Sequence, residues 1–166
     1  MTPQRAFDQY HQAVYGFAYR LTRSPDIAED ITQECFLVLV SAPQRFDESR
    51  GTLKTYLFSI ARNLALKQYR DHSAEEPLDG SEELRAIDPR EALEVSTAVA
   101  KAVAGLPQLQ QQALILFEYE GVTLEEIAQI VGADIGTVKS RLHRARERLR
   151  RFLAPYRKVG NRNATV

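Results

Sequence analysis

The sequence has no tryptophan, one cysteine, one methionine and three histidines, and its 22 basic residues equal its 22 acidic residues. Cys35 cannot form a disulfide within the chain, and its place inside an apolar run predicts a small core residue. The three histidines are far apart, and no E-x-x-H motif is present. These absences predict no catalytic residue, no metal and no cofactor. The strongest enzymatic alternative is a di-metal carboxylate bundle.

Long apolar runs are also lacking. The longest, CFLVLV at 35–40, is far shorter than the ~20 residues of a membrane span. The first ten residues, MTPQRAFDQY, lack the apolar stretch of a signal peptide. We therefore expect a folded cytoplasmic protein with no membrane insertion.

The balanced total charge hides an uneven distribution. Residues 73–91 hold seven acids and two bases, with two prolines, one glycine and few large apolar side chains. Such a segment cannot bury enough surface to fold alone. The sequence therefore predicts an all-α protein of two small helical domains, 1–72 and 92–157, joined by a flexible acidic linker, 73–91, and followed by a tail, 158–166.

The first domain is expected to contain three helices. Apolar residues recur at helical spacing in the first: Phe7, Tyr10, Val14, Phe17 and Leu21. Ser24 and Pro25 are typical of the start of a second helix, which should end near Ala42. Because that helix contains CFLVLV, we expect it to be buried on all sides. A third helix, beginning near Leu53, should follow a loop.

The second domain has the pattern of a helix-turn-helix. Two helices, 91–106 and 108–120, should precede it. Thr123 and Glu126 then match a capping box, Gly132 marks the end of a short helix, and Asp134 should cap the last one. A helix, a short turn with glycine and a second helix define the motif.

Residues 136–151, GTVKSRLHRARERLRR, hold seven cations and one acid, Glu147. Val138, Leu142 and Ala145 share the face that this helix must bury, which leaves the polar side for DNA. The candidates for contact with duplex DNA are Gly136, Thr137, Lys139, Ser140, Arg141, His143, Arg144 and Arg146. Residues near the N-terminus of the helix can reach base edges, and later arginines suit phosphates. Cations on the last turns also favour the helix dipole.

Two further polar surfaces are predicted in the first domain. The second helix carries an acidic strip that suits a basic protein partner, with a solvated face as the alternative: Asp26, Glu29, Asp30, Gln33 and Glu34. The third helix turns Thr55, Ser59, Arg62, Asn63 and Arg70 away from its apolar face. Together with the loop at 47–52, these side chains suit single-stranded bases and their backbone.

Three segments carry a family resemblance. SPDIAEDITQECFLVLV, FDESRGTLKTYLFSIARNLALKQYRDH and GLPQLQQQALILFEYEGVTLEEIAQIVGADIGTVKSRLHRARERLRRFL resemble bacterial sigma-70 factors of the extracytoplasmic-function (ECF) group. The resemblance covers nearly the whole chain apart from the linker and the tail.

The resemblance implies a sigma factor that directs promoter recognition and transcription initiation. Its implied partners are promoter DNA, duplex and single-stranded, and core RNA polymerase, through the beta-prime coiled coil and the beta flap; an anti-sigma factor is a further partner to consider. The acidic strip would bind polymerase, and the last helix would bind the minus-thirty-five element. The residues implied in reading and melting the minus-ten element are Ser49, Arg50, Gly51, Thr52, Ser59, Arg62, Asn63 and Arg70.

The sequence departs from the group at a few positions. Val40 and Tyr56 stand where tryptophans are common, and Ser59 stands where an arginine is common. A valine at position 40 leaves a smaller side chain for the local core to accommodate. The alternative function is a dimeric helix-turn-helix regulator that acts without polymerase, which explains residues 92–152 equally well but not the acidic strip.

Overall fold

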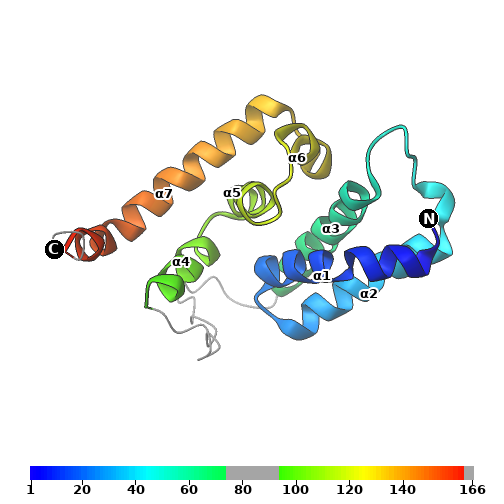
Figure 1. The fold of residues 1–166 in the computed structure, drawn as a ribbon, viewed down its shortest axis with the longest axis horizontal. Helices are drawn as coiled ribbons and strands as arrows, with labels where there is room; N and C mark the ends of the chain where they lie inside the picture. The colour runs from blue at the N-terminus through cyan, green and yellow to red at the C-terminus, as the bar shows by residue number, and fades with distance from the viewer. Residues whose placement is uncertain (74–93, 163–166) are drawn as a thin grey trace.

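A computed structural model describes residues 1–73 and 94–162, and over these ranges the chain is helical, with no strand (Figure 1). The expected linker, from residue 74 on, and residues 163–166 lie outside the described residues. No helix in the described ranges is long and apolar enough to cross a membrane. The helices are α1 (Pro3–Thr22), α2 (Pro25–Ser41), α3 (Leu53–Ser73), α4 (Glu94–Ala104), α5 (Gln108–Leu114), α6 (Leu124–Val131) and α7 (Ile135–Arg162).

The helices α1, α2 and α3 form the first domain, as predicted. Ser24 begins α2 by accepting a hydrogen bond from the Ile27 N–H, directly before Pro25 at the first helical position. The core forms where Phe17 of α1 meets Phe58 of α3, with ring centroids 5.1 Å apart. Cys35 is a core residue, as predicted, and burial raises its pKa to about 12. Its thiol is therefore protonated and unreactive at neutral pH.

The prediction that α2 is buried on all sides is wrong. Leu37 and Val40 lie on its outer side and are 60% and 57% exposed, respectively. A helix that packs against neighbours on one side must leave its other side to solvent, whatever its composition. Val40 therefore leaves no gap in the core, contrary to the expectation from the sequence.

The helices α4 to α7 form the second domain. The two ends of α6 lie where the capping residues of the sequence predict them. Thr123 caps α6 by accepting the Glu126 N–H, and Gly132 ends it in the left-handed conformation, with φ at +66°. The expected single helix at 108–120 is different: α5 passes into one turn of π-helix, η3 (Ile115–Tyr119), before Gly121 turns the chain at φ +63°. The last helix, α7, continues to Arg162, beyond the expected domain end at 157.

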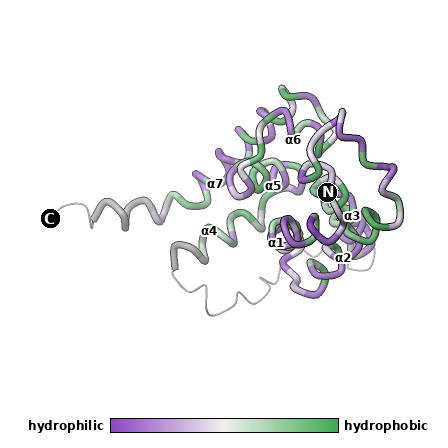
Figure 2. Tube along the Cα trace, turned by 45° about the vertical axis from the view of Figure 1, so that its right-hand side comes forward, coloured by the Kyte–Doolittle hydropathy of each residue, from purple (hydrophilic) through white to green (hydrophobic). Residues whose placement is uncertain are grey.

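The two domains are packed against each other. Helix α3 contacts α6, and α1 contacts η3 (Figure 1). Hydrophobic and hydrophilic segments alternate along the helices of both domains, as amphipathic helices require (Figure 2). The C-terminal part of α7 extends beyond the other helices in Figure 1. The acidic face of α2 and the N-terminal half of α7 therefore remain available, whereas part of α3 is covered.

Candidate nucleic-acid interface

The first part of the candidate interface is the N-terminal half of α7. The Asp134 carboxylate accepts the Thr137 backbone N–H at 2.7 Å, and this bond lowers the pKa of Asp134. Val138, Leu142 and Ala145 are buried, as the helical period predicts. The cap fixes where the helix begins and the buried face fixes its rotation, so the polar side of α7 points outward in a defined register.

The predicted DNA contacts on α7 are not equally available. Five of the eight residues are exposed: Gly136, Lys139, Ser140, His143 and Arg144. The other three, Thr137, Arg141 and Arg146, are half-buried.

Two side chains on this face have protein partners that the sequence did not indicate. Arg146 donates to the Glu118 carboxylate at 3.1 Å and lies over the Phe117 ring, 5.3 Å from its centroid. His143 lies 3.2 Å from the Glu147 carboxylate. Arg146 is therefore held in place by two residues of η3.

The second part is the loop before α3. The Asp47 carboxylate accepts the backbone N–H of Ser49 at 3.0 Å and its hydroxyl at 2.7 Å. These bonds, with a smaller contribution from Arg50, lower the pKa of Asp47. The loop is thus folded by an acidic side chain that holds the next residues, and Ser49, Arg50 and Thr52 remain exposed.

A cavity of about 650 Å³ lies between this loop and α3. Its lining includes the predicted residues Arg50, Gly51, Thr52 and Ser59 together with Phe46, Tyr56 and Gln129. The rings of Phe46 and Tyr56 are 5.3 Å apart and form an aromatic wall. A polar opening with an aromatic wall and nearby cations suits an unstacked base.

Sequence reasoning missed three of these lining residues. Phe46 and Tyr56 could have been found, because aromatic residues flanking a polar loop are typical of base-stacking sites. Gln129 could not, because it comes from α6 in the other domain.

Along α3, the residues of the predicted polar side differ in how exposed they are. Asn63 and Arg70 are exposed, and Ser59 is half-buried, its hydroxyl donating to the Thr55 carbonyl. Thr55 is buried, contrary to the prediction, and its hydroxyl is satisfied there by that of Thr52, 2.8 Å away at the start of the helix. Arg62 donates from Nε to Gln112 Oε1 at 2.9 Å, so the second domain covers it.

All five residues of the acidic strip are exposed along α2: Asp26, Glu29, Asp30, Gln33 and Glu34. No three His, Cys, Asp or Glu side chains gather as metal ligands within residues 1–73 and 94–162. The strip is therefore a continuous anionic surface of the kind that a cationic protein surface complements.

An all-helical chain with a capped helix-turn-helix, a cavity large enough to admit a base beside cationic side chains and an acidic helix face has the make-up of a DNA-binding transcription protein with two domains. Family comparison agrees: residues 6–75 match the model for sigma-70 region 2, and residues 96–149 match the model for sigma-70 region 4.

Relatives and a solved structure identify the group. The chain is 32% identical to the ECF RNA polymerase sigma factor SigW of Bacillus subtilis, over 88% of this chain and 86% of SigW. It is 32% identical to the ECF sigma factor SigE of Mycolicibacterium smegmatis, over 89% of this chain, but it spans only 60% of SigE. The sigma factor RpoE of Bartonella quintana, solved with the anti-sigma factor NepR, has a TM-score of 0.74 and 30% identity, covering 91% of this chain and 96% of RpoE.

The chain belongs to the ECF group of RNA polymerase sigma factors. It therefore directs transcription initiation, and its two helical domains correspond to sigma regions 2 and 4.

Proposed function

We propose that three surfaces of the chain have different roles in initiation. The acidic face of α2 binds core RNA polymerase, the loop at 47–52 and α3 read the minus-ten strand, and α7 reads the upstream duplex. The observation that carries this proposal is that three surfaces, each based on a different helix, have the chemistry that their ligands need.

On α2, five exposed polar and acidic side chains follow one side of the helix, and Leu37 and Val40 add exposed apolar area on the same element. An interface needs apolar area for affinity and charge for orientation. This face supplies both, which favours docking on a basic surface of polymerase, with the beta-prime coiled coil as the partner that the family implies. Contact of the second domain with the beta flap belongs to the same proposal.

The cavity beside α3 accepts a base flipped from the minus-ten element. Ser49, Arg50, Gly51 and Thr52 form its outer edge, and Phe46 with Tyr56 offer rings for stacking. Arg62, Asn63 and Arg70 continue along α3 and contact the strand that leaves the cavity, while Ser59 replaces a longer cation and widens the opening.

On α7, Thr137, Lys139, Ser140, His143 and Arg144 enter the major groove, because residues near the N-terminus of a recognition helix lie nearest the base edges. Gly136 allows close approach of the helix start to DNA, and Arg141 and Arg146 contact phosphates. Arg146 is oriented for this role by Glu118.

The chain itself carries out no chemical reaction, and it works in the cytoplasm beside the polymerase. Since RpoE was solved in complex with an anti-sigma factor, an anti-sigma protein is proposed as a regulator of this chain too.

The proposal is tested by binding of fluorescent promoter DNA with and without core polymerase. Polymerase should confer strong promoter binding on a chain that binds weakly alone. Tight binding of palindromic duplex by the free chain, unchanged by polymerase, would support a dimeric regulator instead.

A further inference from the structure

Three hydrogen-bond donor side chains come together from three helices. Arg62 belongs to α3, Gln112 to α5 and Arg141 to α7, and α5 packs against α7. Arg62 Nε donates to Gln112 Oε1 at 2.9 Å, so the Gln112 amide lies beside the Arg62 guanidinium. Burial and, to a smaller extent, the positive charge of Arg141 lower the pKa of Arg62, as expected for two cations that lie close together. The cluster therefore combines two cations and an amide from distant parts of the chain.

Two donors of this cluster are left without an acceptor. Gln112 is 1% exposed, and its Nε2 is buried without a hydrogen-bond partner among the residues that the structure describes. Arg141 Nη1 is buried and unpartnered in the same way. A buried donor that lacks an acceptor destabilises the fold, and a charged donor does so more strongly. The cluster therefore needs an acceptor that the described chain does not supply.

The acidic residues of the chain do not fill this need. The ion pairs among the described residues involve neither Arg62 nor Arg141. Asp134 lies near enough to Arg141 for that charge to help lower its pKa, but its carboxylate caps α7 through the Thr137 N–H. A water molecule can accept from two donors but leaves both positive charges uncompensated, whereas an oxyanion accepts from several donors and also neutralises charge. The cluster thus has the chemistry of an anion site.

A cavity of about 360 Å³ adjoins the cluster, because Gln112 forms part of its wall. The wall also includes Gln68, Tyr69, Gln108 and Gln111. A cavity of this size suits a small organic molecule. Amide side chains suit the polar edge of a nucleobase, and an aromatic ring suits its flat face. The cavity therefore has room and chemistry for the nucleoside part of a nucleotide.

We propose that Arg62, Gln112 and Arg141 bind the phosphate group of a small molecule in the free chain. Two sources supply this chemistry: inorganic phosphate, which needs the three donor groups alone, and a nucleotide, whose nucleoside occupies the cavity. The site goes beyond the roles of Arg62 and Arg141 on promoter DNA, because it includes the buried Gln112 of α5 and needs no nucleic-acid strand.

The substitution Gln112→Glu tests the site without any ligand, because it adds a carboxylate of the same size beside the two guanidinium groups. A buried carboxylate destabilises a protein unless cations pair with it. In phosphate-free buffer, Gln112→Glu should therefore melt at a higher temperature than the native chain. Gln111→Glu is the matched control: Gln111 is 7% exposed, and its Nε2 donates to the Val103 carbonyl at 3.3 Å, so a carboxylate there should lower the melting temperature.

Titration calorimetry of the full chain at constant ionic strength measures binding directly, with inorganic phosphate, adenosine 5′-monophosphate and adenosine as probes. Arg141→Ala should weaken phosphate binding by about 10- to 150-fold, the range for a hydrogen bond to a charged group. Arg148→Ala, which removes an exposed arginine of the same helix, should leave it unchanged. A monophosphate that binds more tightly than phosphate would assign the cavity to a nucleotide, and equal affinities would assign the site to phosphate alone.

Either of two results would overturn the proposal. One is a Gln112→Glu chain that melts below the native chain. The other is a native chain that binds neither phosphate nor the monophosphate more tightly than chloride, or that binds adenosine as tightly as its monophosphate. Both measurements use the chain without DNA or polymerase, so their outcome is independent of the proposed function.

Discussion

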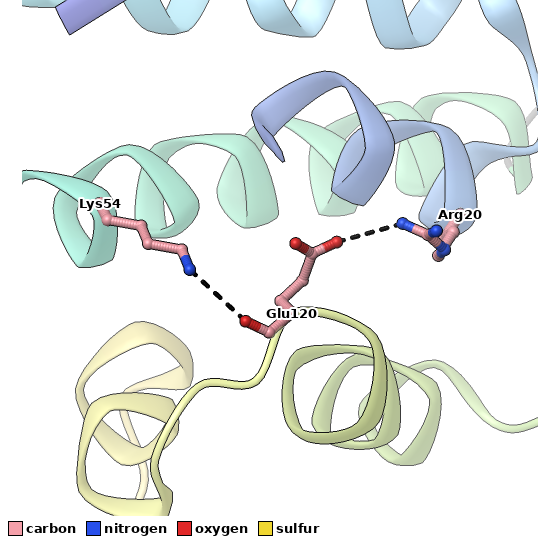
Figure 3. Close-up of polar contacts among 3 residues, drawn as sticks. All are labelled: Arg20, Lys54 and Glu120. Carbon is pink, nitrogen blue, oxygen red and sulfur yellow. Dashed lines mark hydrogen bonds and ion pairs between the residues drawn. The ribbon is translucent and has the colours of Figure 1, made fainter. Parts of the chain in front are cut away.

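Removing Arg20 should separate the two domains of the free chain, which gives an open state. Neutralising Glu120 in the same chain should bring the domains together again in the closed state that the structure shows. Arg20 Nη1 donates to the Glu120 carboxylate at 3.2 Å, and Lys54 Nζ donates to the Glu120 backbone carbonyl at 3.4 Å (Figure 3). Arg20→Ala leaves a carboxylate with a 9% exposed side chain deprived of its ion-pair partner, with only the more distant charge of Lys54 near it. A buried polar group that loses its partner costs about 1–3 kcal/mol.

Arg20 itself is 38% exposed, so water already screens part of the pair, and we expect about 1–2 kcal/mol. That difference shifts the ratio of closed to open chain by about 5- to 30-fold toward the open state, at 1.36 kcal/mol per tenfold.

The double variant, Arg20→Ala with Glu120→Gln, removes the uncompensated charge and keeps the size of the side chain and the carbonyl that Lys54 contacts. It should therefore be more closed than Arg20→Ala alone, which a simple count of lost contacts does not predict. Arg5→Ala is the matched control, because it removes the same charge from an exposed position of the same helix.

The pH dependence has a definite sign. Burial raises the pKa of Glu120 above its ordinary value, although Arg20 and Lys54 oppose the shift. A carboxyl whose pKa is raised in the closed state favours closure once it is protonated, and this contribution is lost as the pH rises above the raised pKa. Acidification from neutral pH should therefore close Arg20→Ala progressively, and should affect the double variant much less.

The assay is single-molecule energy transfer between labels at Ser41→Cys and Ala154→Cys in the full chain. Equal closed fractions in the native chain and Arg20→Ala would refute the reasoning, as would a double variant more open than the single one.

Three further changes test the assigned surfaces. Charge reversal by Asp30→Lys with Glu34→Lys should weaken core polymerase capture in a pull-down while the circular dichroism of the chain is unchanged, since exposed charges rarely support a helix; full capture would remove this face from the interface. Arg144→Ala should cost about 1–3 kcal/mol of discrimination in competition over a randomised upstream element, whereas Arg150→Ala should weaken all sequences evenly; even losses from both would reduce Arg144 to a phosphate contact. Asn63→Ala should impair open complexes on duplex promoters without weakening polymerase binding, and a premelted promoter should recover part of the activity if opening is the lost step; normal duplex opening would contradict the assignment.

Interactions between residues close in sequence made much of this fold predictable. Ser24, Gly132 and Asp134 begin or end helices in the structure as the sequence indicates, because each cap depends on atoms within a few residues. The buried face of α7 follows in the same way from a clear helical period.

What could not be predicted depends on partners distant in sequence. In α2 the unbroken apolar run has no polar side to indicate which residues face solvent, and only packing against neighbouring helices leaves Leu37 and Val40 outside. The Arg20 and Glu120 pair is 100 residues apart, and neither residue stands in a motif. The domain interface, and with it the cover over the minus-ten cavity, therefore emerged only from the structure.

The central claim is that this chain directs core RNA polymerase to promoters. Sequencing the 5′ ends of transcripts made in vitro from genomic DNA by core polymerase, with and without the chain, tests it most directly. Start sites that appear only with the chain should share an upstream duplex element and a minus-ten element at a fixed spacing, and Arg144→Ala should relax the upstream element alone. A set of start sites identical to that of core polymerase alone would contradict the account.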